Sequence, residues 1–410
     1  MSRDTRRIRE GLATLAMAVA LTLSAGQAKA AGITTLASFD GPNGTYPYSG
    51  LTDVGGTLYG TTAGGGATGY GTLFSWSASS GLQTLFTGFD FTNGANPVAG
   101  LTNVNSTLYG TTAGGGANGD GALFSWSASN GFSTLVNFAG NNGANPRAGL
   151  LDVNGTLYGT TGAGGSGANS DGTLFSWSPN GGGLTTLASF DYYSNGVNPF
   201  AGLTDVGGTL YCTTSGGGAG GGDGTLFSYA SGTLTTLVNF DNTNGGGPAA
   251  RLLAVNGTLY GTTTGGGPSG EGTLFSWSPS NGLQTVVAFD GANGSIPYGK
   301  LIAVNGTLYG TTYWGGANGD GTLFSWSLSN GLTTLASFDG TNGANPHAGL
   351  TDVGGTLYGT TYGGGADDSG TIFSYTPASQ SVPEPGSLPL LLAGLGGLGA
   401  LYLRRRLHLS

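Results

Sequence analysis

The sequence is poor in the residues that most often carry chemistry. Its 410 residues include one cysteine and two histidines, and charged residues make up only 8% of the chain. A single cysteine, Cys212, excludes an intrachain disulfide. Outside the C-terminal end the only histidine is His347, and no Ser/His/Asp order, Cys/His pair or His-rich metal pattern can be built. We therefore expect that the chain is not an enzyme.

Basic residues are also scarce, and most of the eleven lysines and arginines lie near the two ends of the chain. The region between the ends contains only Arg147, Arg251 and Lys300, against most of the twenty acidic residues. This strongly acidic balance excludes nucleic acid as a partner, because binding phosphates requires clustered Lys and Arg. It is compatible with a neutral glycan or a cation.

Glycine is by contrast abundant, at 86 residues, and it recurs in register with aliphatic and aromatic residues. A Thr-Leu-Tyr motif returns every 49–53 residues, with its tyrosine at Tyr59, Tyr109, Tyr158, Tyr211, Tyr260, Tyr309 and Tyr358. Each copy is typical of four short strands, here called A to D. They are exemplified by residues 348–353, 356–361, 322–326 and 332–338. A two-residue Gly-Gly or Asn-Gly turn, the strongest hairpin signal, joins strands A and B.

The offset of the repeats predicts a closed ring. Residues 33–40 correspond to a strand D without strands A to C, and the last copy ends at Tyr375 without a strand D. The two pieces complete one blade, which removes open sheet edges. A linear solenoid would instead need capping repeats. We predict an all-β, seven-bladed β-propeller of four-stranded blades over residues 31–377, with the ring closed by an N-terminal outer strand.

The N-terminal end has the features of a secretory signal. Residues 1–30 combine a basic start, a short apolar stretch and an A-x-A site formed by Ala28 and Ala30. This arrangement predicts a signal peptide that is cleaved after Ala30, and the alternative is an N-terminal membrane anchor.

The C-terminal end has a second set of targeting features. A linker at 378–385 ends with Pro383-Glu384-Pro385, and residues 386–410 combine an apolar run with three arginines. Such a run can just span a bilayer with its arginines in the cytoplasm. We predict a transmembrane sorting tail, and the alternative is a plain C-terminal anchor.

These features resemble two known families. The C-terminal end resembles the PEP-CTERM sorting signal. That resemblance implies recognition by an exosortase, a transient stay in the inner membrane of a Gram-negative bacterium, and delivery to the cell surface or extracellular matrix. The repeat carries Gly-Thr-Leu-Tyr-Gly-Thr-Thr, then Gly-Gly-Gly and Gly-Thr-Leu-Phe-Ser, over residues 33–375. It resembles the GloVer tandem repeat of bacterial choice-of-anchor proteins, which implies no catalytic residues.

The candidate binding residues lie on one predicted face. Because the chain reverses at each strand, the long B–C and D–A loops share a face, and long loops on a rigid scaffold usually carry binding. The residue after the D–A loop proline varies most between copies, Arg251 and Lys300 replace a glycine nearby, and Trp314 replaces a glycine in a B–C loop. Chance variation at exposed loop ends is the alternative to function. The predicted ligand-binding set is Arg147, Arg251, Tyr298, Lys300, Trp314 and His347.

Acidic residues on the same face are candidate calcium ligands. Asp120, Asp171, Asp223 and Asp320 each come just before a strand C, and a ring of carboxylates suits calcium. The alternative is turn chemistry, because aspartate favours such turns through bonds to the backbone, and the spacing does not match a calcium-binding loop. We expect no other cofactor.

Together these features indicate an exported, non-catalytic binding or structural module for exopolysaccharide or another surface ligand. The alternative is a hydrolase or lyase that acts on polysaccharide from a propeller scaffold, since a glycosidase needs only two carboxylates.

Overall fold

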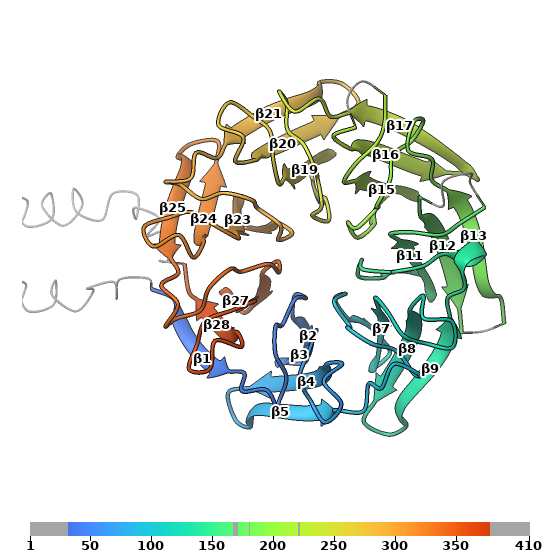
Figure 1. Ribbon diagram of the computed structural model, residues 1–410. Helices are drawn as coiled ribbons and strands as arrows, with labels where there is room; N and C mark the ends of the chain where they lie inside the picture. Colours follow the sequence, from blue (N-terminus) through green and yellow to red (C-terminus); the bar gives the residue numbers. More distant parts are fainter. Residues whose placement is uncertain (1–31, 167–170, 180, 220–221, 378–410) are drawn as a thin grey trace, which may run out of the picture. The chain divides into compact units, whose positions relative to one another are not determined.

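The described part of the chain is built from short antiparallel strands. The computed structural model describes residues 32–377, except for 167–170, 180 and 220–221. Within these residues there are 28 strands and one 3-10 turn, η1 (Gly140–Asn142), and the strands form seven four-stranded sheets. The sheets are arranged as the blades of a ring (Figure 1). The prediction of an all-β, seven-bladed propeller is confirmed.

Each of the first six blades uses four consecutive strands, ordered from the axis outward. Blade 1 contains β2 (Thr52–Val54), β3 (Thr57–Thr62), β4 (Thr72–Ser77) and β5 (Gly81–Phe86). Blade 2 contains β6 (Thr102–Val104), β7 (Thr107–Thr112), β8 (Ala122–Ser127) and β9 (Gly131–Asn137). Blade 3 contains β10 (Leu151–Val153), β11 (Thr156–Thr161), β12 (Thr173–Ser178) and β13 (Gly183–Ser189).

The other blades follow the same order. Blade 4 contains β14 (Thr204–Val206), β15 (Thr209–Thr214), β16 (Thr225–Ala230) and β17 (Thr233–Asn239). Blade 5 contains β18 (Leu253–Val255), β19 (Thr258–Thr263), β20 (Thr273–Ser278) and β21 (Gly282–Ala288). Blade 6 contains β22 (Ile302–Val304), β23 (Thr307–Thr312), β24 (Thr322–Ser327) and β25 (Gly331–Ser337). Blade 7 contains β26 (Thr351–Val353), β27 (Thr356–Thr361), β28 (Thr371–Tyr375) and β1 (Thr34–Ser38).

The ring closes in blade 7 as the repeat offset predicts. Strand β1 pairs antiparallel with β28, in a register that places Thr34 opposite Ser374 and Ser38 opposite Thr371. Figure 1 shows the first strand of the chain (blue) beside the last (red). Phe39, directly after β1, is completely buried against Phe74 of blade 1. Closure of the ring therefore adds buried side-chain packing as well as backbone pairing between β1 and β28.

The innermost strand of each blade is shorter than predicted. The sequence favours a strand over residues 348–353, but β26 begins at Thr351. The segment 348–350 is instead hydrogen-bonded to blade 6, where the Thr311 hydroxyl donates to the Ala348 carbonyl oxygen at 3.2 Å. These residues continue toward the axis as loop. The A–B turn matches its prediction, since Gly55 and Gly56 have φ of 62° and 85°, the conformation of a type I′ hairpin turn.

The seven blade interfaces repeat one packing scheme. The phenylalanine after each strand D packs edge-on against the strand C phenylalanine of the next blade, with ring centroids 5.0–5.5 Å apart in every interface. In five interfaces the strand B tyrosine also contacts the strand C tryptophan of a neighbouring blade, at 5.8–6.2 Å. The tryptophans repeated in strand C therefore have a packing role. Aromatic pairs of this kind add to the stability that their burial provides.

A threonine of strand B binds each blade to the next near the axis. Its buried hydroxyl donates to a carbonyl oxygen of the following D–A loop or of the residues just after it. The seven donors are Thr61, Thr111, Thr160, Thr213, Thr262, Thr311 and Thr360. The loop ends that surround the axis are thus fixed to the core, which makes them a rigid frame for side chains.

Candidate functional site

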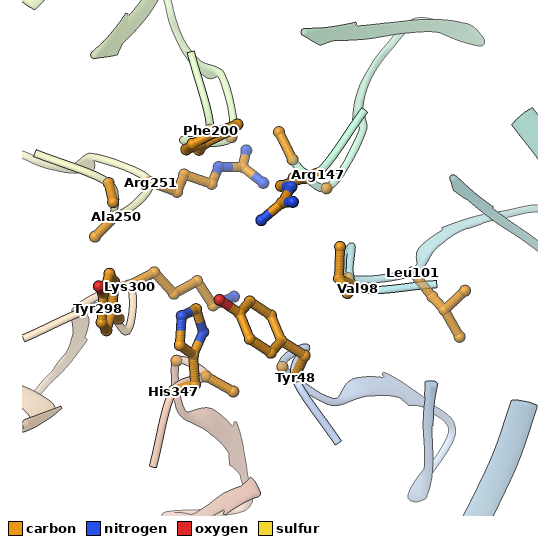
Figure 2. Close-up of a pocket in the computed structure, with 18 of the residues that line it drawn as sticks. Tyr48, Val98, Leu101, Arg147, Phe200, Ala250, Arg251, Tyr298, Lys300 and His347 are labelled. Atoms are coloured by element: carbon orange, nitrogen blue, oxygen red, sulfur yellow. The ribbon is translucent and has the colours of Figure 1, made fainter. Parts of the chain in front are cut away.

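The ring of loop ends encloses a pocket on the propeller axis. All seven residues that follow a D–A loop proline line this axial pocket, together with Arg251 and Lys300. The seven residues are Tyr48, Val98, Arg147, Phe200, Ala249, Tyr298 and His347. Figure 2 shows the side chains of Tyr48, Arg147, Arg251, Lys300 and His347 directed from the surrounding blades into one space. Five of the six predicted ligand-binding residues therefore line a single pocket.

His347 is held between two tyrosine rings. Its imidazole lies 3.6 Å from the Tyr48 ring and 4.4 Å from the Tyr298 ring, measured between centroids (Figure 2). Its Nε2 atom is buried and has no hydrogen-bond partner among the described residues. The pKa of His347 is lowered to about 3, chiefly by burial and to a smaller extent by the charge of Arg147, while a backbone hydrogen bond with Tyr48 acts in the opposite direction. The imidazole is therefore neutral at physiological pH.

Three cationic side chains enter the pocket, and no Asp or Glu is found among its lining residues in the described part of the chain. Arg147 is oriented by a bond from its Nε to Asn145 Oδ1 at 3.0 Å, and its guanidinium lies 5.2 Å from the Phe200 ring centre. Burial lowers the pKa of Arg251, and burial together with the charge of Arg251 lowers that of Lys300. Lys300 exposes its surface to the pocket, while the walls around it still remove much of its hydration. The pocket thus favours an anion.

Arg251 and Lys300 also line another hollow along the axis, toward the A–B turns, together with three carboxylates from other blades. The three carboxylates are Asp53, Asp152 and Asp352. Each comes three residues after the glycine that occupies the repeat position of Arg251 and Lys300. In the blades that carry Arg251 and Lys300, the position of the carboxylate is Ala254 or Ala303. Blades 5 and 6 therefore carry the cation without a carboxylate in their own innermost strand, and the nearest carboxylates on the axis come from other blades.

Trp314 lies outside the axial pocket. It is 45% exposed and its ring contacts Tyr313 edge-on at 5.1 Å. The residues at its position in the other copies are Gly64, Gly114, Ala163, Gly216, Gly265 and Gly363. Trp314 thus reaches the pocket residues only through Tyr313, which contacts Tyr298 at 5.7 Å and His347 at 6.1 Å.

The sequence reasoning missed three tyrosines beside the pocket: Tyr46, Tyr313 and Tyr362. Tyr362 stacks on Tyr46 at 4.7 Å and contacts Tyr48 edge-on at 6.0 Å. Tyr313 and Tyr362 replace smaller residues in blades 1 to 5, and this departure from the repeat was a usable signal. With His347 and the pocket tyrosines they form an aromatic arc on one side of the axis.

The four candidate calcium ligands are not brought together. Each lies in the B–C loop of its own blade, and no group of three or more His, Cys, Asp or Glu residues that could hold a metal is present among the described residues. Asp120 Oδ2 accepts a bond from the Gly140 amide at 2.8 Å, and Asp171 Oδ2 accepts one from the Tyr192 amide at 2.7 Å. These two carboxylates fix the backbone of neighbouring loops.

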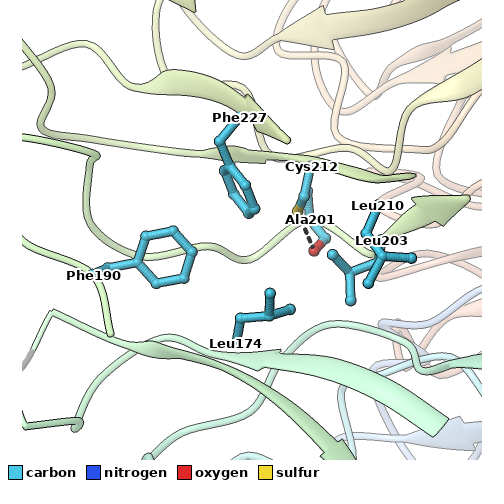
Figure 3. Close-up of a cluster of buried hydrophobic side chains, with 7 residues drawn as sticks. All are labelled: Leu174, Phe190, Ala201, Leu203, Leu210, Cys212 and Phe227. Atoms are coloured by element: carbon cyan, nitrogen blue, oxygen red, sulfur yellow. Dashed lines mark hydrogen bonds between the residues drawn. The ribbon is translucent and has the colours of Figure 1, made fainter. Parts of the chain in front are cut away.

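Cys212 is a core residue. It is completely buried beside Phe227, and its Sγ donates to the Ala201 carbonyl oxygen at 3.1 Å (Figure 3). Burial raises the pKa of the thiol to about 12. Because the thiolate is the reactive form of cysteine, Cys212 is unsuited to nucleophilic chemistry.

Replacing Gly349 with alanine is expected to reduce stability, because Lys300 lies across it. A Cβ at Gly349 would lie 2.9 Å from the Lys300 carbonyl oxygen and 3.0 Å from its amide nitrogen, and would also meet the Lys300 side chain. Such overpacking costs about 1–3 kcal/mol. Gly100 occupies the same repeat position with no atom within 4 Å, so Gly100→Ala is the matched control. Equal melting temperatures for the two variants would contradict this packing.

The comparisons with known proteins identify the repeat and the tail. The Gloeobacter/Verrucomicrobia repeat matches residues 21–227, 164–307 and 283–384, and the PEP-CTERM protein-sorting motif matches residues 381–406. The chain belongs to the family of Gloeobacter/Verrucomicrobia repeat proteins. Its sorting motif indicates export to the cell envelope or surface. No curated protein matches the sequence.

Both targeting segments lie outside the residues that the structure describes. These segments are the predicted signal peptide at 1–30 and the predicted sorting tail at 386–410. No helix in the described part of the chain has the length and apolar character needed to cross a membrane.

Solved structures share the fold at low sequence identity. A Bacteroides uniformis protein assigned as a 6-phosphogluconolactonase is 14% identical, with a TM-score of 0.50 over 76% of this chain and 89% of that chain. A gluconolactonase from Xanthomonas campestris is 13% identical, with a TM-score of 0.42 over 68% of this chain and 85% of that chain. The likeness to the Bacteroides uniformis protein shows the fold alone.

This likeness nevertheless corrects one expectation. The prediction that the chain is not an enzyme is contradicted by the name of the Bacteroides uniformis protein, which points to enzymatic activity on this fold. The prediction relied on the scarcity of histidine and cysteine. That scarcity excludes particular nucleophile and metal patterns, and it leaves chemistry that depends on other side chains open.

Proposed function

We propose that this exported propeller binds an anionic saccharide in its axial pocket. The observation that carries the proposal is the convergence of Arg147, Arg251 and Lys300 on a space lined by no described carboxylate. Partly desolvated cations without a protein counter-ion are costly. A carboxylate or phosphate group on a ligand would supply the missing negative charge.

The remaining lining supports a sugar as the carrier of that negative charge. The rings of Tyr48, Tyr298 and His347 stack at one wall, and Phe200 lies at another beneath Arg147. Aromatic faces suit the C–H surfaces of a sugar ring, while cations and a few polar groups fix its orientation. Delivery to the cell envelope or surface, indicated by the sorting motif, would bring the pocket into contact with anionic glycans.

Binding of the purified protein to polygalacturonate, with neutral dextran as the comparison, tests this proposal. We expect binding of polygalacturonate that weakens with salt, and little binding of dextran. Arg251→Gly/Lys300→Gly should weaken binding at least tenfold, because each charged contact contributes about 1.4 kcal/mol or more. Glycine is the residue that the other five blades use at this position, so the double variant should melt at or above the wild-type temperature. Equal binding of both polymers, or unchanged binding by the folded double variant, would refute the proposal.

A second candidate is hydrolysis of a sugar-acid lactone in the same pocket, suggested by the name of the Bacteroides uniformis protein that shares the fold. Water would add to the lactone carbonyl, the ring C–O bond would break, and the products would be a hydroxyl group, a carboxylate and a released proton. Arg251 and Lys300 could stabilise the oxyanion that forms and the carboxylate product. Proton release from glucono-δ-lactone, faster with the wild type than with the double variant, would support this activity.

A further inference from the structure

The axial pocket continues into a second hollow on the same face. This side hollow is bounded by loops of blades 7, 1, 2 and 3, and it shares Tyr48, Val98 and Arg147 with the axial pocket. The axial pocket has a volume of about 230 Å³, below the roughly 300–1,000 Å³ of typical ligand sites. The side hollow adds about 470 Å³. A ligand anchored on the axis therefore has room to continue sideways.

The side hollow has the lining of a sugar site. Tyr362 forms one side, the side chains of Asn96 and Asn145 contribute amide groups, and Asp120 contributes a carboxylate that accepts from the Gly140 amide. Asn96 Nδ2 donates to the Ala63 carbonyl oxygen at 2.9 Å, and Asn145 Oδ1 accepts from Arg147. These bonds fix both amides and leave other donors and acceptors of each group for sugar hydroxyls.

Tyr46 supports Tyr362 at an energetic cost. Tyr46 has φ of 59°, a left-handed conformation that costs most side chains roughly 1–2 kcal/mol. Five other copies place Asn or Gly at this position, and the remaining copy has Ile296. All seven copies adopt this backbone conformation, so the cost arises from placing a tyrosine where most copies have asparagine or glycine. Tyr46 places its 41% exposed ring flat against Tyr362, which orients the tyrosine that faces the hollow.

We propose that the side hollow is a second saccharide subsite, so that the ligand is an oligosaccharide of at least two residues. This inference rests on the proposed function of the axial pocket. The anionic end residue occupies the axial pocket, and the next residue lies against Tyr362 with its hydroxyls at Asn96 and Asn145. Arg147, shared by the two spaces, lies where the residues join.

Calorimetric titration with galacturonate and its oligomers of two to four residues tests the subsite. For the wild type we expect the affinity to rise on the order of tenfold from one residue to two, as a stacking contact and new hydrogen bonds would give. Tyr362→Ala should remove most of this gain and leave the affinity for galacturonate nearly unchanged. Alanine occupies the same position in blades 1 and 2, so the variant is compatible with the fold. Thr264→Ala, at the same position in blade 5, is the control and should behave as wild type.

A second variant separates binding from folding. Tyr46→Asn installs the residue that most copies use and should keep or raise the melting temperature, yet it should reduce the gain from the second sugar. Equal affinity for galacturonate and its dimer would overturn the subsite while leaving the proposed function standing. An undiminished gain in both Tyr362→Ala and Tyr46→Asn would also overturn it. Absence of binding for every member of the series would overturn the proposed function and, with it, the subsite.

Discussion

Deleting residues 33–40 is expected to lower the melting temperature by at least about 5 °C, since for a domain of this size each kcal/mol corresponds to roughly 1.4 °C. The deletion removes β1, whose ladder with β28 closes the ring. It also removes Phe39, which is completely buried against Phe74, and loss of a buried phenylalanine side chain alone costs about 3–5 kcal/mol. The exposed edge of β28 would further promote aggregation. Thermal unfolding followed by circular dichroism measures the effect.

A loop deletion provides the comparison. The D–A loop between blades 3 and 4 has one residue more than the corresponding loop before blade 7, and Tyr193 in it is 75% exposed. Removing Tyr193 should change the melting temperature by only a few degrees, since exposed residues contribute little to stability. If the β1 deletion melts as close to wild type as this control does, the closing strand does not stabilise the ring.

His347 is expected to make the free energy of unfolding decrease as the pH is lowered from 6.5 toward 3. The folded pKa is about 3, below the value of 6.5 for the free side chain, so the unfolded chain binds the proton more tightly. The contribution is complete above pH 6.5 and is lost as the pH falls from 6.5 toward 3. The loss amounts to roughly 3 kcal/mol by pH 4, at about 1.4 kcal/mol for each pH unit.

The variant His347→Val removes the pH-dependent contribution of the imidazole to stability. Valine is compatible with the fold, because it is the residue of blade 2 at the same position. At pH 7 the variant should be somewhat less stable than wild type, since it loses the stacking on Tyr48 and Tyr298. At pH 4 the order should reverse. Titrating groups elsewhere are present in both proteins, so their contributions cancel in the comparison. Parallel curves of unfolding free energy against pH for the two proteins would show that His347 titrates normally.

The fold could be predicted because each local signal repeats seven times. The period of the Thr-Leu-Tyr motif, the Gly-Gly turns and the unmatched strand at residues 33–40 together specify blade number, strand order and closure. The length of the innermost strand could not be predicted in this way. Residues 348–350 have strand-like composition, but a hydrogen bond from Thr311 of the neighbouring blade holds this segment as loop, and such a partner is not visible in a local pattern.

The site was predicted in part, and the reasons differ from residue to residue. The post-proline residues follow from topology, because each one must enter the strand nearest the axis. Trp314 was selected for its size and its departure from the repeat, yet it lies one ring away from the pocket. Tyr46 and Tyr362 were missed because a tyrosine does not stand out in a sequence with 18 of them. Their pairing joins two loops that are 316 residues apart in the chain and become neighbours only on closure.

The fixed loop ends around the axis have a consequence for how recognition can change. Each post-proline side chain projects from a backbone that the threonine of the preceding blade holds in place, so the residue there can differ without moving the frame. The seven copies already place six different residue types at this position in one molecule: valine, alanine, phenylalanine, tyrosine, arginine and histidine. Under the proposed function, selectivity would therefore depend on about one residue from each repeat. A library randomised at these positions would explore new ligands on a constant scaffold.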